Sequence, residues 1–176
     1  IWNDVFMEYE KINGKIVSKL TKKNVDTGAG FERICAILQG KKSVFDTDVF
    51  SNLMAIASQL TSDPRRQRII ADHIRASVIL VADGVSPSNT DQGYVLRRLI
   101  RKAIISSDSK MMPREAIVDC VHAVVKYFGD HYGELAGMAD RIIATISDES
   151  SKFAEAIKSG LRELSKIDSE VITGKQ

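Results

Sequence analysis

The chain has 176 residues, of which 44% are hydrophobic and 27% are charged, and its formal net charge is +2. This length suits one domain or a domain plus a piece of another, and the apolar fraction is sufficient for a hydrophobic core. No apolar run reaches the roughly 18–20 residues of a membrane span, since Arg75 interrupts the longest candidate, IRASVILVA. We therefore expect no membrane partner.

The first residues are typical of a β-hairpin. Residues 2–12 are rich in Val, Ile and aromatic side chains, and Asn13-Gly14 is a strong signal for a two-residue turn. Residues 16–25 follow as the return strand. Because a hairpin alone is marginally stable in water, we expect this one to be the remnant of a larger sheet.

After Gly30 the apolar residues recur with the 3.6-residue period of helices. Gly40 ends the first helix, Asp46-Thr47-Asp48 can cap the second, and Pro64 opens the third. The predicted helices cover residues 31–39, 48–60, 64–84, 93–106, 113–128 and 132–167, the last as one helix or two. The predicted fold class is therefore α+β and mostly α, with an N-terminal antiparallel β-hairpin followed by a helical bundle.

The cysteines and histidines form no metal-binding pattern. Cys35 and Cys120 lie far apart in apolar surroundings, and the sequence contains neither CxxC nor HxxxH. We therefore predict no metal ion and two buried, reduced thiols, as is usual for a cytoplasmic protein. The chain begins at Ile1-Trp2 without an initiator Met or a signal peptide, so we expect it to be a piece of a longer protein.

Basic residues are concentrated in the middle of the chain. In the predicted helix over residues 93–106 they fall on one side and the apolar residues on the other, which favours a polyanionic partner. The alternative is a merely solvated basic face. Between Pro64 and Lys102 the basic residues are Arg65, Arg66, Arg68, Arg75, Arg97, Arg98, Arg101 and Lys102, against the acidic Asp72, Asp83 and Asp91.

The stretch NVDTGAGFER, residues 24–33, carries the clearest chemical signal. An aspartic protease would need a second Asp-Thr-Gly and an all-β fold, and here the motif leads directly into the helical FERICAIL. A GxxxxGK[ST] phosphate loop is excluded because no such Lys follows. A purely structural strand-to-helix turn stays open. As a site, Gly28 and Gly30 would let a ligand approach the backbone, Asp26 could hold an ammonium group, and Arg33 could bind phosphate or stack on a base.

VDTGAGFER resembles the third signature motif of class II aminoacyl-tRNA synthetases in its alanine-specific form. IWNDVFMEY is similar to the strand that precedes this motif in alanyl-tRNA synthetases. RIIADHIRASVILVADGVSPSNTDQGYVLRRLIRKAI resembles the start of that family's tRNA-recognition helices. The resemblance covers about residues 1–107, and the later EAIKSGLREL fits more weakly. One departure is IISSDSK, where the family continues its Arg-rich helix with further basic residues and His-Gly.

The resemblance implies a ligase that activates alanine with Mg²⁺-bound ATP and transfers it to tRNA(Ala). Residues 1–45 would be the C-terminal end of its catalytic domain and residues 46–176 a helical tRNA-recognition domain. The first and second signature motifs would lie before Ile1, so the chain alone is expected to be inactive. The implied alanine site is Asp26, Gly28 and Asn3, and the implied ATP site is Arg33, Glu32 and Gly30.

For the acceptor stem, the resemblance implies that Arg97, Arg98, Arg101 and Lys102 hold the RNA backbone. Asn89, on the preceding loop, would read the G·U wobble pair that identifies tRNA(Ala), together with an Asp expected beyond Gln176. The residues leave a second role open for Asn89, the capping of the helix. Two other functions also remain as alternatives: a non-enzymatic helical RNA-binding module, and a helical interaction domain.

Overall fold

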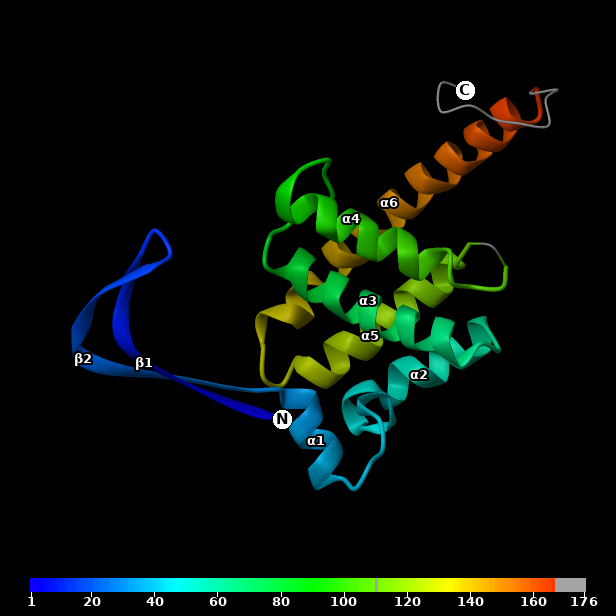
Figure 1. The fold of residues 1–176 in the computed structure, drawn as a ribbon. Coiled ribbons are helices and arrows are strands. Elements are labelled where there is room, and N and C mark those ends of the chain that lie inside the picture. The colour runs from blue at the N-terminus through cyan, green and yellow to red at the C-terminus, as the bar shows by residue number, and fades with distance from the viewer. Residues whose placement is uncertain (110, 167–176) are drawn as a thin grey trace. The chain divides into compact units, whose positions relative to one another are not determined.

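The computed structural model describes residues 1–109 and 111–166, and its internal contacts divide the chain into two units, Ile1–Ser51 and Asn52–Gln176. The predicted α+β, mostly helical fold is confirmed: in the described residues an antiparallel hairpin precedes six α-helices. The elements are β1 (Trp2–Ile12), β2 (Lys15–Ala29), α1 (Phe31–Leu38), the 3₁₀ turn η1 (Val44–Asp46), α2 (Asp48–Leu60), α3 (Pro64–Ala82), α4 (Asp91–Ile104), α5 (Arg114–Phe128) and α6 (Glu134–Leu164) (Figure 1).

The hairpin turns where the sequence predicts, but its return strand is longer. Asn13 and Gly14 have φ values of 50° and 83°, which a type I′ turn requires at both central residues. β2 continues to Ala29, four residues beyond the predicted end at Val25, because residues 26–29 pair with residues 2–5 of β1. The Asp-Thr-Gly motif therefore lies within a strand rather than in a turn.

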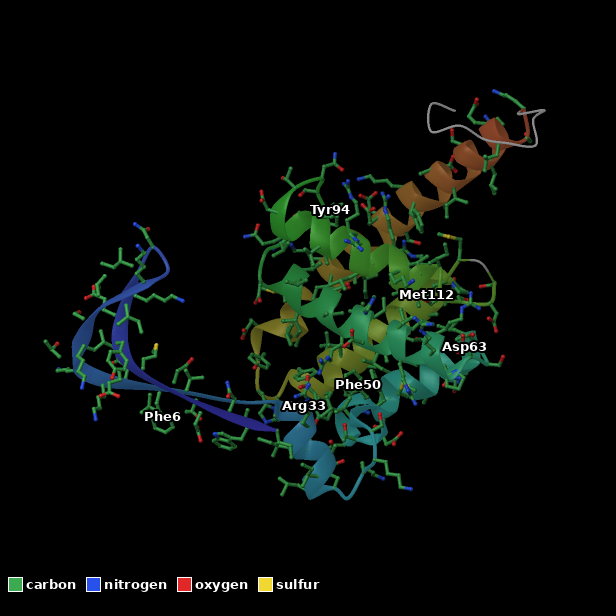
Figure 2. The ribbon with its side chains drawn as sticks, viewed as in Figure 1. Phe6, Arg33, Phe50, Asp63, Tyr94 and Met112 are labelled. Atoms are coloured by element: carbon green, nitrogen blue, oxygen red, sulfur yellow. The ribbon has the colours of Figure 1, made fainter. Side chains whose placement is uncertain are left out.

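Both faces of the hairpin carry exposed apolar side chains. Trp2 is 65% exposed, Phe6 77% and Ile16 67%, and Figure 2 labels Phe6 in the hairpin. A two-stranded sheet buries little apolar surface by itself. The expectation that this hairpin belongs to a larger sheet stays a prediction.

The core of the second unit surrounds α3, which contacts α4, α5 and α6. Asp63 caps α3 by accepting a hydrogen bond from the backbone N–H of Arg65 at 2.8 Å, and Pro64 occupies the first turn. Two other residues of α3, Ile69 and His73, are only partly buried. Fully buried side chains at this core include Ile70, Ile74, Val78, Leu96, Ile100, Ile104, Ile117, Val121, Ile142 and Ile146.

The final predicted segment forms one continuous helix, α6, of 31 residues. Its first half buries Leu135, Ile142 and Ile146, whereas Leu161 and Leu164 near its end are exposed. The predicted end at Ile167 lies outside the described residues. In the part of the chain that the structure describes, every helix is too short or too polar to cross a membrane.

The two thiols differ. Cys120 of α5 is buried, and its burial, with the nearby charge of Asp119, raises the pKa of the thiol to about 12. Cys35 of α1 is only partly buried, so the expectation of a buried thiol there is wrong. The reason is that α1 is short and buries only Ala36.

Candidate functional site

The hairpin brings together the three residues of the implied alanine site. In the observed register Asn3 lies opposite Gly28, and Val5 lies opposite Asp26. Side chains alternate between the faces of a strand, and directly paired residues share a face. Asn3, Asp26 and Gly28 therefore lie on one face of the hairpin, and all three are exposed.

The opposite face holds a short chain of hydrogen bonds that the sequence analysis missed. Trp2 Nε1 donates to Thr27 Oγ1 at 2.7 Å, and Thr27 Oγ1 donates to Asp4 Oδ1 at 2.6 Å. The Thr of the Asp-Thr-Gly motif thus ties the two strands together. With Thr27 bonded on one face, its neighbours Asp26 and Gly28 are presented on the other.

No internal packing explains the glycine at position 28. Its φ is not positive, and a Cβ added there would meet no described atom within 4 Å. Gly30 differs, because a Cβ there would lie 3.1 Å from Arg33 Cδ. The backbone N–H of Gly30 donates a hydrogen bond to the Ile1 carbonyl. Gly30 also directly precedes α1, so Arg33 and the partly buried Glu32 lie in the first turn of that helix (Figure 2).

The loop before α4 is folded tightly against the first turn of that helix. Ser88 Oγ donates to the Thr90 carbonyl at 2.8 Å, and the Ser88 N–H donates to the Gly93 carbonyl at 3.0 Å. A Cβ at position 93 would lie 2.3 Å from Ser88 Oγ and 2.5 Å from the Ser86 carbonyl oxygen. Only glycine fits there, and this close approach fixes the loop that carries Asn89.

Asn89 does not cap α4, so the capping alternative is wrong. The N-cap residue is Thr90, and its side chain makes no capping hydrogen bond. Asn89 is exposed, and its Oδ1 accepts a hydrogen bond from Nη1 of Arg97, two turns into α4. The structure thus joins two of the implied RNA-binding residues directly.

The four cations of α4 divide into two pairs. Arg97 and Arg101 face α6, where the carboxylate of Glu149 is only 3% exposed. Glu149 Oε1 lies 2.7 Å from Arg101 Nε and 3.5 Å from Arg97 Nε, and the Arg101 guanidinium lies 4.9 Å from the centre of the Phe153 ring. Arg98 and Lys102 are exposed. The helix therefore does not present one uniform basic face.

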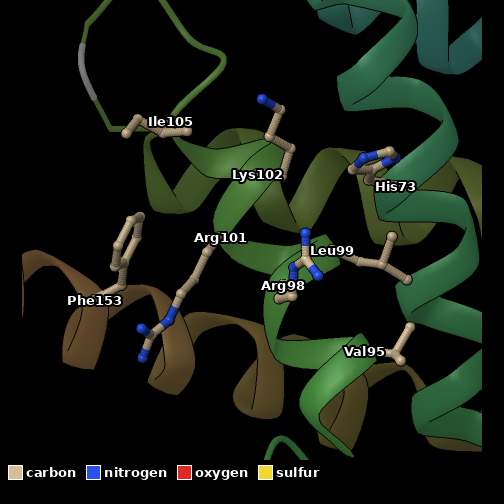
Figure 3. A pocket seen from close by; sticks show the side chains of 8 residues that line it. All are labelled: His73, Val95, Arg98, Leu99, Arg101, Lys102, Ile105 and Phe153. Carbon is tan, nitrogen blue, oxygen red and sulfur yellow. The ribbon is translucent and has the colours of Figure 1, made fainter. Parts of the chain in front are cut away.

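Arg98 and Lys102 border a groove of about 530 Å³ (Figure 3). In Figure 3, Arg101 extends toward α6 and Phe153, whereas Lys102 points away from α6. The Arg98 guanidinium lies 5.7 Å from the centre of the Tyr94 ring. The groove is lined by His73, Val95, Arg98, Leu99, Arg101, Lys102, Ile105 and Phe153. Its mixture of apolar and cationic side chains is suited to a ligand that carries negative charge.

His73 on the rim of this groove is held by the residue before it. Its Nδ1 lies 2.9 Å from Asp72 Oδ2. The hydrogen bond with His73 lowers the pKa of the Asp72 carboxyl, aided by the charges of His73 and Arg75 and opposed by burial. Asp72 therefore stays ionised at neutral pH and adds one negative charge beside the basic groove.

Among the described residues, no three His, Cys, Asp or Glu side chains are grouped closely enough to hold a metal ion.

The whole chain, residues 1–176, matches the family described as tRNA synthetases class II (A). The chain therefore belongs to this family of class II tRNA synthetases. Similar curated proteins are alanine–tRNA ligases, and the predicted resemblance to alanyl-tRNA synthetases is confirmed. The ligase of Methylobacillus flagellatus is 40% identical over 99% of this chain, that of Orientia tsutsugamushi (strain Ikeda) 38% over 100%, and that of Borrelia hermsii 41% over 95%. The chain spans 21%, 20% and 30% of these relatives' lengths.

Proposed function

We propose that this chain is part of a cytoplasmic alanine–tRNA ligase, which forms alanyl-adenylate from alanine and ATP and transfers the alanyl group to tRNA(Ala). Residues 1–45 form the end of the catalytic domain, and residues 46–176 recognise the tRNA. The family match supports this reading. The observation that carries it is the grouping of Asn3, Asp26 and Gly28 on one hairpin face, immediately before the helix that presents Arg33.

In this proposal Asp26 holds the alanine ammonium group through a charge-assisted hydrogen bond. The open space above Gly28 receives the methyl group of alanine, and Asn3, directly opposite, borders it. Gly30, Glu32 and Arg33 contribute to the site of Mg²⁺-bound ATP, with the Arg33 guanidinium on the phosphates or the base. Catalysis rests on positioning and charge stabilisation.

We expect no alanine activation by the chain alone. Asp26 is exposed on a two-stranded sheet, and a surface ion pair contributes only about 0–1 kcal/mol. A small-molecule site instead buries most of its ligand. Alanine-dependent ATP–pyrophosphate exchange should therefore equal that of the Asp26→Ala chain, with a full-length alanine–tRNA ligase as the positive control. Exchange well above the Asp26→Ala background would contradict this expectation.

We further propose that the loop before α4 and the helix itself bind the acceptor stem. Phosphate contacts from the α4 cations would hold the backbone without reading sequence. The RNA minor groove is wide and shallow, so Asn89 on its fixed loop can reach a base edge there. In this proposal the α4 cations hold the RNA backbone and Asn89 reads a base. The observation that supports these two roles is the hydrogen bond from Arg97 to Asn89, which keeps the Asn89 amide beside the basic helix.

Asn89→Ala should erase a preference for a G·U over a G·C minihelix, a preference of about 1–3 kcal/mol at most. The physical reason is that the unpaired exocyclic amine of the wobble guanine needs an acceptor, which the Asn89 side chain supplies. The measurement is binding of the two minihelices at one salt concentration. Asn52→Ala, an exposed Asn on α2, is the matched control. Equal weakening of both complexes by Asn89→Ala would show that Asn89 does not read the pair.

A further inference from the structure

The middle of α6 places a carboxylate on the apolar side of the helix. Glu149 is 3% exposed and follows the buried Ile142 and Ile146 at helical spacing. Burying a carboxylate is unfavourable unless cations and hydrogen bonds compensate for its lost hydration. Here the compensating groups are Arg97 and Arg101, which both come from α4. Glu149 thus connects two helices through charge.

Arg97 depends on the Glu149 charge more than Arg101 does. Arg97 and Arg101 lie one turn apart on α4 and repel each other. Arg101 also donates a hydrogen bond to Glu149 and packs over the Phe153 ring. Arg97 Nε is buried without a hydrogen-bond partner among the described residues, 3.5 Å from the carboxylate oxygen. Apart from the hydrogen bond that its Nη1 donates to Asn89, the Arg97 guanidinium is therefore held by electrostatic attraction to Glu149.

The far end of the Arg97 guanidinium reaches the loop. Its Nη1 donates to Asn89 Oδ1, and Asn89 does not cap the helix. Gly93 and Ser88 fix the loop backbone, but the orientation of the Asn89 side chain is set by its bond to Arg97. A continuous set of contacts therefore runs from α6 through α4 to the loop.

We propose that Glu149 is a positioning residue for acceptor-stem recognition: its buried carboxylate holds Arg97, and Arg97 orients the Asn89 amide. This inference rests on the proposed role of Asn89. Glu149 itself touches no RNA in this arrangement. Its contribution is to keep the Asn89 side chain in one orientation before the RNA arrives, so that binding need not order it.

The test is Glu149→Gln, which keeps the shape of the side chain and removes its charge. Glu155→Gln, an exposed position on the same helix, is the matched control. The first readout is the NMR signal of the Asn89 side-chain amide in the free protein, assigned by its loss in Asn89→Ala. The second readout is the ratio of the dissociation constants for G·C and G·U minihelices.

In Glu149→Gln the Asn89 amide signal should shift toward that of the exposed Asn52, and the G·U preference should fall several-fold. In the Asn89→Ala background the same substitution should change the preference no further. Glu155→Gln should alter neither readout. If Glu149→Gln fails to fold, Arg97→Ala serves instead, because it leaves the Glu149–Arg101 hydrogen bond in place, and it should move both readouts in the same direction.

An unchanged Asn89 signal in these variants would overturn the proposal, even if both RNA affinities fell equally, because Glu149 would then act on stability alone. A shifted signal with an unchanged G·U preference would overturn it as well. A wild-type chain without any G·U preference would refute the role of Asn89 in the proposed function. In that case a shifted signal would still support the link from Glu149 to Asn89.

Discussion

Ile104→Ala should lower the free energy of unfolding of the helical unit by about 2–5 kcal/mol, the usual cost of deleting a fully buried branched side chain. Ile104 is 0% exposed, so its removal leaves a cavity in the core. Urea unfolding followed by circular dichroism at 222 nm measures the effect. The loss should appear as a lower midpoint with an unchanged slope.

The adjacent Ile105 provides the control. It is 43% exposed and lies on the rim of the basic groove, so Ile105→Ala removes a side chain that already contacts water. We expect this second substitution to cost about 1 kcal/mol or less, by the scaling of stability with buried apolar area. Equal effects of the two substitutions would contradict the burial of Ile104 and the exposure of Ile105.

The double substitution Arg98→Ala with Lys102→Ala should flatten the salt dependence of minihelix binding. Each lost phosphate contact lowers the slope of log K against log salt by about 1, so the expected change is about 2. The loss should be the same for G·U and G·C stems, because phosphate contacts carry no sequence information. The measurement is binding across a series of salt concentrations.

Two comparisons make this result specific. Arg114→Ala with Lys126→Ala removes two exposed cations of α5 and should leave the slope nearly unchanged. Arg101→Ala should change the slope by less than one, because the Glu149 carboxylate already offsets that charge. A similar slope change in both double variants would mean that net charge, and not the α4 face, drives binding.

The helices could be predicted from the sequence because their signals are local. The apolar period, Pro64 and the loop residues before α4 were sufficient to place α3 and α4 within a few residues. The hairpin register could not be predicted in this way. Irregularities between Met7 and Tyr9 and between Glu10 and Lys11 shift the pairing. An unbroken register from the turn would place Trp2 opposite Val25, whereas it lies opposite Ala29.

The division of the α4 cations could not be predicted either, because it depends on a partner that lies 48 residues beyond Arg101. Helical periodicity shows which residues share a face, but not which other helix covers that face. One signal was present in the sequence: Glu149 interrupts an otherwise apolar stripe of α6 that contains Ile142, Ile146 and Phe153. A charged residue in such a stripe indicates a buried ionic partner.

The difference between the two thiols makes selective chemical labelling possible. At pH 8 a thiol with a pKa of about 12 is almost entirely protonated, and Cys120 is also shielded from reagents. Cys35 is accessible in part and lies on α1, close in sequence to Glu32 and Arg33. A maleimide dye will therefore attach to this folded chain at Cys35 and not at Cys120. That place is next to the proposed nucleotide site, so the wild-type sequence already accepts a fluorescent reporter there without mutagenesis.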